Sequence, residues 1–288
     1  MPKIISAGGG KGGIGKSFFS ANIGGLLSMI GKKTLVIDLD TGGPNLHTFL
    51  GVSNPSKGLW NYFNQELSLE ECIIETNYKR LSLLNSKNCS KDIGNQPYSL
   101  RNILYKDIKR LQYDYIIIDL GAGINKASID FFLLADLPFA LFTSDPLSLE
   151  NSFKFVHKVF LQKIAEIVPP KKLNSQCSAI LKSNSTIRPG DILERLQELD
   201  SPYYPELKKT MENFKLYLTA CKVDNSDTAK NIESFYKKFF GDNISLAGII
   251  PYSLNIEKSV YKRKLYVAEY KKDKALKNLM NIVKKVIL

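Results

Sequence analysis

The feature that most constrains this chain is a run of glycines and lysines near its start, Gly10-Lys11-Gly12-Gly13-Ile14-Gly15-Lys16-Ser17. The run follows a short apolar segment, residues 3–7, that is typical of a strand, and it leads into a helical pattern over residues 16–30. Glycines let a backbone wrap closely around an anion and adopt positive φ, so that several N–H groups converge on phosphate oxygens. The run therefore fits the phosphate-binding P-loop, Gly-x-x-x-x-Gly-Lys-Ser.

Two side chains of this loop have a chemical role in such a site. Lys16 would neutralise the β and γ phosphates of a nucleoside triphosphate, and Ser17 would ligate Mg²⁺. The dipole of the helix that begins near Lys16 adds to the same anion site.

Strand-like and helical segments alternate along the rest of the chain. Strands are predicted at residues 3–7, 34–38, 81–84, 115–119, 138–143, 216–221 and 245–250, and helices at residues 16–30, 99–111, 126–134, 149–167, 228–240 and 274–286. This alternation predicts an α/β fold, a mostly parallel sheet with helices on both faces, joined by right-handed crossovers. In such a sheet the ligand lies at the carboxyl ends of the strands.

One stretch, residues 169–213, breaks the alternation with prolines, a polar run and one helical pattern over residues 191–199. We predict a single domain over residues 1–288, in which residues 169–213 form an insertion with short helices on the rim. An alternative, in which residues 177–181 are a further strand of the sheet, stays open.

The net charge and the cysteines indicate which partners and which cellular compartment the protein could have. The chain has 40 Lys and Arg against 28 Asp and Glu, a formal charge of +12. Nucleic acid or an anionic membrane surface would fit this charge, as would lysines spread over a solvated surface. The four cysteines are far apart and form no C-x-x-C, so neither a disulfide framework nor a zinc or iron–sulfur site is expected. We expect a reduced, cytoplasmic protein.

Membrane contact, if any, is expected to be peripheral. The start of the chain lacks the apolar stretch of a signal peptide, and no segment reaches the roughly 18 apolar residues of a spanning helix. The final residues, 274–288, place apolar side chains on one helical face and lysines on the other. Such a pattern is typical both of a last helix packed on a sheet and of a peripheral membrane anchor at the inner face of the membrane.

Carboxylates end two of the predicted strands. Asp38 and Asp40 follow the apolar residues 34–37, and Asp119 follows residues 115–118. A buried strand that delivers one acid to a metal, usually through water, is the Walker B arrangement of P-loop proteins. We therefore expect these carboxylates to lie beside the loop at the same edge of the sheet.

The loop residues Lys11 to Ser17 resemble the deviant Walker motif of the MinD/ParA family, K-G-G-x-G-K-[ST]. The resemblance implies a P-loop ATPase fold, ATP and Mg²⁺ as cofactors, and a homodimer with ATP sandwiched at its interface. It implies that Lys11 reaches the phosphates of the partner chain as a finger in trans, which would stabilise charge on the transferring phosphoryl group.

Further segments extend this resemblance. Residues 38–45 resemble the family's first switch, D-x-D-x-G-x-x-N, which implies that Asp40 positions the attacking water and Asp38 supports the metal shell. Gly121 falls in the second switch, and Gly248-Ile249-Ile250-Pro251-Tyr252 resembles a strand end that lies against adenine. Where the family has an Asn that reads adenine, this chain has Cys221.

The resemblance implies three sets of site residues. For catalysis they are Lys11, Lys16 and Asp40, and for Mg²⁺ they are Ser17, Asp38 and Asp119. For ATP they are Gly10, Lys11, Gly12, Gly13, Ile14, Gly15, Lys16, Ser17, Phe18, Gly121, Cys221, Pro251 and Tyr252.

The strand ends after residues 119 and 143 resemble most the flagellar-number ATPases of the MinD branch. That likeness implies a nucleotide-dependent dimer switch for flagellar placement or a division site, with a protein partner that stimulates hydrolysis. The alternative is a ParA-type DNA-partitioning ATPase. The charge of +12 favours this alternative, whereas the strand ends of the MinD type count against it. A tyrosine kinase is a third hypothesis, based on Tyr261, Tyr266 and Tyr270.

Overall fold

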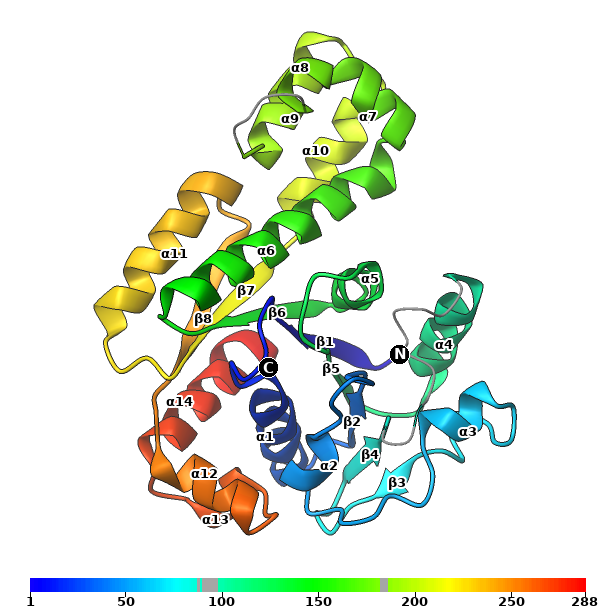
Figure 1. Ribbon diagram of the computed structural model, residues 1–288, viewed down its shortest axis with the longest axis vertical. Helices are drawn as coiled ribbons and strands as arrows, with labels where there is room; N and C mark the ends of the chain where they lie inside the picture. The colour runs from blue at the N-terminus through cyan, green and yellow to red at the C-terminus, as the bar shows by residue number, and fades with distance from the viewer. Residues whose placement is uncertain (87–88, 90–97, 182–185) are drawn as a thin grey trace.

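The computed structural model describes residues 1–86, 89, 98–181 and 186–288, and its centre is an eight-stranded sheet (Figure 1). The strands lie in the order β3-β4-β2-β5-β1-β6-β7-β8, and all neighbours are parallel except β3 and β4. Their bounds are β1 Lys3–Gly8, β2 Thr34–Asp38, β3 Ile74–Glu75, β4 Leu81–Leu84, β5 Tyr115–Asp119, β6 Leu137–Phe142, β7 Leu216–Cys221 and β8 Ile244–Ile250.

Helices cover both faces of this sheet, each over its own hydrophobic core. Alternate residues of one strand serve the two cores: Ile4 of β1 faces one of them and Ile5 the other. The helices are α1 Lys16–Met29, α2 Leu46–Phe49, α3 Leu59–Phe63, α4 Tyr98–Arg110, α5 Lys126–Leu133, α6 Pro146–Ile167, α7 Pro170–Gln176, α8 Ser178–Leu181, α9 Pro189–Glu198, α10 Tyr204–Asn213, α11 Ser226–Phe240, α12 Leu254–Tyr261, α13 Tyr266–Glu269 and α14 Lys274–Ile282. Helices α1, α2, α13 and α14 cover one face, and α4, α5, α6 and α11 cover the other.

The register of the central strands brings the predicted acidic residues together. Asp38 of β2 pairs with Asp119 of β5, and Asp119 pairs in turn with Ala7 of β1. The loop after β1 therefore starts at the same edge of the sheet at which both carboxylates end. The predicted α/β fold with a mostly parallel sheet is confirmed.

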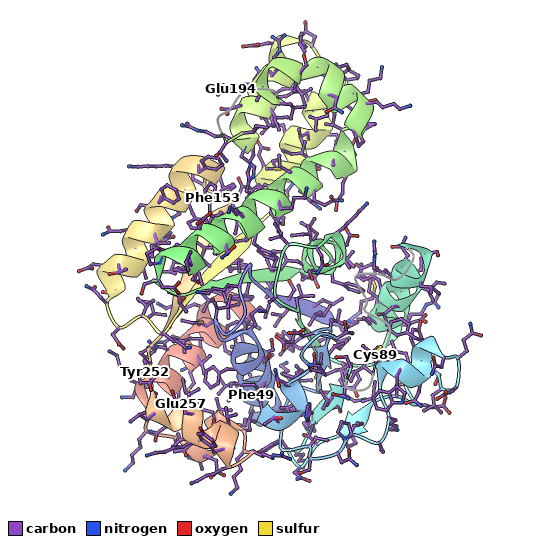
Figure 2. The ribbon with its side chains drawn as sticks, in the orientation of Figure 1. Phe49, Cys89, Phe153, Glu194, Tyr252 and Glu257 are labelled. Carbon is purple, nitrogen blue, oxygen red and sulfur yellow. The ribbon has the colours of Figure 1, made fainter. Side chains whose placement is uncertain are left out.

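The segment 169–213 consists of helices α7 to α10, which gather around the far end of α6 (Figure 1). In Figure 2, Glu194 of α9 lies at the opposite end of the molecule from Tyr252 and Glu257. The alternative strand at residues 177–181 is wrong, because Ser178–Leu181 form α8 and Cys177 ends α7. That residues 169–213 are an insertion into one domain remains a prediction.

The C-terminal segment is a core element in this structure. In α14 and the π-helical turn Val283–Ile287 that follows it, the apolar residues Leu276, Leu279 and Val283 are buried against the sheet and α1. This packing favours the core helix over the membrane anchor, because the apolar face is already covered. Within the part of the chain that the structure describes, no helix is long and apolar enough to cross a membrane.

Candidate functional site

The loop between β1 and α1 needs its glycines for two physical reasons. Gly13 and Gly15 have φ of 74° and 101°, and Gly15 forms the N-cap of α1. A Cβ on Gly10 would lie 2.1 Å from the backbone oxygen of Asn151 in α6, so only glycine allows this approach. The loop is thus held against the start of α6 with a curvature that suits a bound anion.

The two lysines of the loop have different environments. Lys16 is buried, and its Nζ donates a hydrogen bond to the Lys11 carbonyl at 3.2 Å. Burial lowers the pKa of Lys16, and the negative charges of Asp119 and Asp40 oppose this shift. Lys11 is partly exposed and forms an ion pair with Asp145 at 3.0 Å.

Asp145 is itself fixed at the start of α6. One of its oxygens accepts from the backbone N–H of Ser148 at 2.9 Å, which caps the helix, and the other accepts from the Thr143 hydroxyl. These hydrogen bonds, with that from Lys11, lower the pKa of Asp145 to about 2. In this structure, therefore, Lys11 is held within its own chain.

Asp119 has the properties of a metal-binding carboxylate. It is buried, its Oδ1 accepts from the Ser20 hydroxyl at 3.1 Å, and its Oδ2 has no hydrogen-bond partner. Burial raises the pKa of Asp119 to about 6, while Ser17 and Lys16 counteract the shift. A buried unpartnered oxygen beside Ser17 and the phosphate loop fits an Mg²⁺ ion that takes its other ligands from phosphate and water.

The described residues contain no cluster of three or more His, Cys, Asp or Glu side chains that could hold a metal by themselves. At nucleotide sites Mg²⁺ is bound by one or two protein groups plus the phosphates.

Asp38 shapes the turn after β2. It is fully buried; its Oδ1 accepts from the backbone N–H of Asp40 at 3.0 Å and the Ser86 hydroxyl at 3.3 Å, and its Oδ2 accepts from the N–H of Leu46 at 3.2 Å. Burial, together with the charge of Asp119, raises the pKa of Asp38. In this structure, therefore, two of these three donors to Asp38 are the backbone N–H groups of Asp40 and Leu46, within or next to the segment that resembles the first switch.

Asp40 faces the open side of the same turn. Its Oδ1 accepts from the backbone N–H of Gly43 at 3.1 Å, and Asn45 donates to the Gly43 carbonyl at 2.8 Å. Asp40 also lies against Gly121, because a Cβ there would be 3.2 Å from the same Oδ1. The two predicted switches, after β2 and after β5, therefore meet at Asp40.

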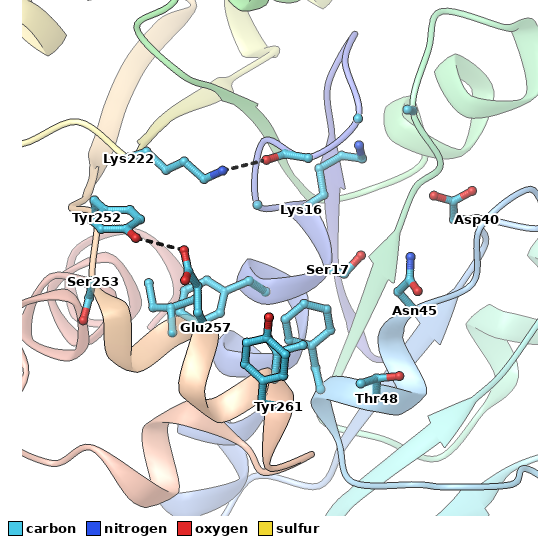
Figure 3. Close-up of a pocket in the computed structure, with 18 residues that line it drawn as sticks. Lys16, Ser17, Asp40, Asn45, Thr48, Lys222, Tyr252, Ser253, Glu257 and Tyr261 are labelled. Atoms are coloured by element: carbon cyan, nitrogen blue, oxygen red, sulfur yellow. Dashed lines mark hydrogen bonds between the residues drawn. The ribbon is translucent and has the colours of Figure 1, made fainter.

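A cavity of about 520 Å³ opens beside the loop (Figure 3). This volume is within the range of small-molecule sites. Nine residues singled out from the sequence line it: Gly12, Gly13, Gly15, Lys16, Ser17, Phe18, Asp40, Asn45 and Tyr252. Its wall also includes residues that the sequence analysis did not assign to the nucleotide site, namely Thr48, Phe49, Ala122, Lys222, Ser253, Ile256, Glu257, Val260 and Tyr261.

Four of these residues, Ile256, Glu257, Val260 and Tyr261, belong to α12, which follows β8. Tyr252 and Glu257 are joined by a hydrogen bond of 2.9 Å from the tyrosine hydroxyl, and Figure 3 shows both facing the cavity. Ser253 caps α12 through the N–H of Asn255, at 3.2 Å. A serine just before a helical pattern was the one sequence signal that could have revealed this helix.

The other predicted contact residues lie outside the lining of this cavity. They are Gly10, Lys11, Ile14, Asp38, Asp119, Gly121, Cys221 and Pro251. Cys221 supports the loop from below, since a Cβ on Gly15 would lie 3.4 Å from its Sγ. Burial raises the pKa of the Cys221 thiol to about 12, so it is a neutral packing group. Pro251 is buried, and its neighbour Tyr252 is the residue that reaches the cavity.

Comparisons with known proteins identify the family of the chain. A family profile described as AAA domain matches residues 2–166, more than half of the chain. A putative septum site-determining protein MinD of Tupiella akineta is 27% identical over 196 residues, which are 67% of this chain and 63% of that protein. The septum site-determining protein MinD of Helicobacter pylori is 32% identical over 165 residues, 54% of this chain and 58% of that protein. The matches thus span about 60% of the length of these two relatives.

Solved structures share the fold over almost the whole chain. The cell division ATPase MinD of Pyrococcus furiosus superposes with a TM-score of 0.68 at 19% identity, covering 99% of this chain and 98% of that one. The septum site-determining protein MinD of Pyrococcus horikoshii, solved with Mg-ADP, gives a TM-score of 0.67 at 18% identity, covering 99% and 96%. The Mg-ADP complex agrees with the predicted cofactors, ATP and Mg²⁺. With its P-loop, its paired acidic strand ends and these matches, the chain belongs to the AAA domain family and has the P-loop fold of the MinD structures.

Proposed function

We propose that this protein hydrolyses ATP and acts as a nucleotide-dependent dimer switch that regulates where a structure forms in the cell. The observation that carries the proposal is the meeting of Lys16, Asp40 and Asp119 at one edge of the sheet, beside a loop that only glycines can form. The septum site-determining relatives support the positional role.

Each group would have a defined part in the chemistry. The N–H groups of the loop and the ammonium of Lys16 would bind the phosphates, and Ser17 and Asp119 would hold Mg²⁺. Bound Mg²⁺ supplies positive charge that neutralises the transferring phosphoryl group. Asp40, which is fixed by Gly43, would orient the attacking water. Phosphoryl transfer requires little else from a protein.

Dimerisation would involve Lys11. The side chain is partly exposed and forms an ion pair with Asp145 at the surface. Exposed ion pairs contribute about 0–1 kcal/mol, so Lys11 can leave Asp145 at little cost when a second chain approaches. A lysine that reaches the phosphates of the partner would couple hydrolysis to the dimer.

The replacement Asp40→Ala tests this function. We expect ATP binding to persist and hydrolysis to fall by about 100-fold or more, because the water loses its positioning group. Light scattering should show an ATP-dependent dimer that lasts longer than that of the unchanged protein. Asp242→Ala, which removes an exposed carboxylate after α11, serves as the matched control. An Asp40→Ala protein that stays monomeric with ATP would contradict the dimer switch.

A second function, ATP-dependent DNA binding of the partition type, has one observation in its favour. Residues 254–288 contain ten Lys and Arg against three Asp and Glu, so much of the net charge of +12 lies near the C-terminus. Non-specific DNA binding should appear with ATP and weaken steeply with salt. A gel shift at low salt that shows no ATP-dependent retention would exclude this alternative.

A further inference from the structure

Lys222 has an unusual backbone conformation for its residue type. It follows β7 directly, and its φ of 56° lies in the left-handed region, which costs free energy for a side chain with a Cβ. Its N–H donates to the Ile250 carbonyl at 2.7 Å, so the ends of β7 and β8 hold it in place. Among the described residues, five non-glycine positions have positive φ, and Lys222 is the one that lines the cavity. Strain of this kind is often retained at functional sites.

The side chain of Lys222 reaches the phosphate loop. Its Nζ donates a hydrogen bond to the Gly13 carbonyl at 3.3 Å, across 209 residues of sequence, as the dashed line in Figure 3 shows. Gly13 is one of the two glycines whose positive φ forms the loop, and both residues line the cavity.

Two lysines thus hold carbonyls of the loop from different elements. Lys16 binds the Lys11 carbonyl from within α1, and Lys222 binds the Gly13 carbonyl from the end of β7. Among the ion pairs of the described residues, Lys11 has Asp145 as its partner, whereas none involves Lys222. Among the described residues, the exposed ammonium of Lys222 therefore has no ion-pair partner at the mouth of the anion site.

We propose that Lys222 is a third lysine of the nucleotide site, which fixes the loop through Gly13 and adds positive charge to the triphosphate from within the same chain. The inference rests on the proposed binding of ATP at this cavity. It assigns to Lys222 a positioning role that is independent of a dimer, in contrast to the role implied for Lys11.

The test compares Lys222→Asn, Lys222→Arg and Lys215→Asn. Asparagine tolerates the left-handed conformation, so the first variant removes the ammonium without added backbone strain. Arginine retains the charge, and Lys215 is an exposed lysine just before the other end of β7. Calorimetry would give the Kd of each protein for ATP, ADP and adenosine.

We expect Lys222→Asn to bind ATP and ADP about tenfold more weakly, as for the loss of a charged hydrogen-bonding group, and adenosine unchanged. Lys222→Arg should restore most of the affinity, and Lys215→Asn should bind as the unchanged protein does. The melting temperature of Lys222→Asn should stay the same or rise. If that variant failed to fold, Lys222→Gly, which also accepts positive φ, would replace it.

Three results would overturn the inference. The first is an ATP affinity of Lys222→Asn equal to that of the unchanged protein, and the second is an equal loss of affinity in the Asn and Arg variants. The third is a parallel loss of affinity for adenosine, which would place Lys222 at the nucleoside. If instead the unchanged protein bound no ATP, the proposed function itself would fail.

Discussion

The cavity has two sides that are built in different ways. The loop side includes Gly12, Gly13, Gly15, Lys16, Ser17 and Asp40, with Asp38 and Asp119 behind them. The helix side includes Lys222, Tyr252 and residues of α12. On the loop side Lys16, Asp38 and Asp119 are buried, whereas on the helix side Tyr252 is 49% exposed and Glu257 is exposed.

This difference in burial shows on which side of the cavity charged groups are removed from water at a cost in folding free energy. A charge removed from water is costly unless it is paired, and the shifted pKa values of Lys16, Asp38 and Asp119 record that cost. A bound nucleotide and its metal would offset this cost, because they supply opposite charges to the buried groups. The exposed groups of the helix side carry little such cost, so we expect substitutions there to have smaller effects.

The largest effect is expected for Lys16→Met. Without its ammonium the loop should bind ATP at least about 100-fold more weakly, because a charge-assisted contact to phosphate is lost in a buried site. The folded protein should be as stable as before or more stable, because methionine of similar length needs no hydration. Fluorescent ATP titration and thermal melting check the two expectations. Lys32→Met, at an exposed lysine just beyond α1, is the control; equal affinity in both variants would place the phosphates elsewhere.

Asp119→Asn should have opposite effects on stability and activity. The pKa of Asp119 is raised from 3.8 to about 6. Between these values the folded chain keeps a proton that the unfolded chain releases, so this residue lowers stability as pH rises from about 4 to 6. Above that window the cost is about 2–3 kcal/mol, from about 1.4 kcal/mol for each pKa unit.

The variant should therefore melt at a higher temperature than the unchanged protein at pH 7 without nucleotide, and at nearly the same temperature at pH 4. Its Mg²⁺-dependent hydrolysis should fall by about 100-fold, since an amide is a poor ligand for Mg²⁺. Melting curves from pH 4 to 8 and phosphate-release assays measure both effects. Parallel pH curves for the two proteins would contradict the buried-acid explanation.

The smallest effect is expected on the helix side, for Tyr252→Ala. The loss of a half-exposed ring from the wall should weaken ATP binding by about threefold to tenfold and leave the melting temperature unchanged. Tyr252→Phe removes only the hydroxyl that donates to Glu257, and it should bind ATP nearly as the unchanged protein does. Competition titrations resolve such factors. If Tyr252→Ala lost as much ATP affinity as Lys16→Met, the expected difference between the two sides of the cavity would be wrong.

The sequence by itself determined most of the strands and the loop side of the site. Strand positions such as Thr34–Asp38 and Tyr115–Asp119 agree with prediction because runs of buried β-branched residues between turns are a local signal. The glycines of the loop are likewise dictated by local backbone geometry, and the acids follow from the rule that parallel strands end at one edge.

The tertiary structure alone decided which distant residues complete the site. The bond from Lys222 to Gly13 spans 209 residues and that from Lys11 to Asp145 spans 134, and both depend on how strands β6, β7 and β8 line up beside β1. The basic amphipathic pattern of residues 274–288 is typical both of a core helix and of a membrane anchor. Only the packing of Leu276 and Leu279 against the sheet chose between them, because the burial of an apolar face depends on what lies opposite it.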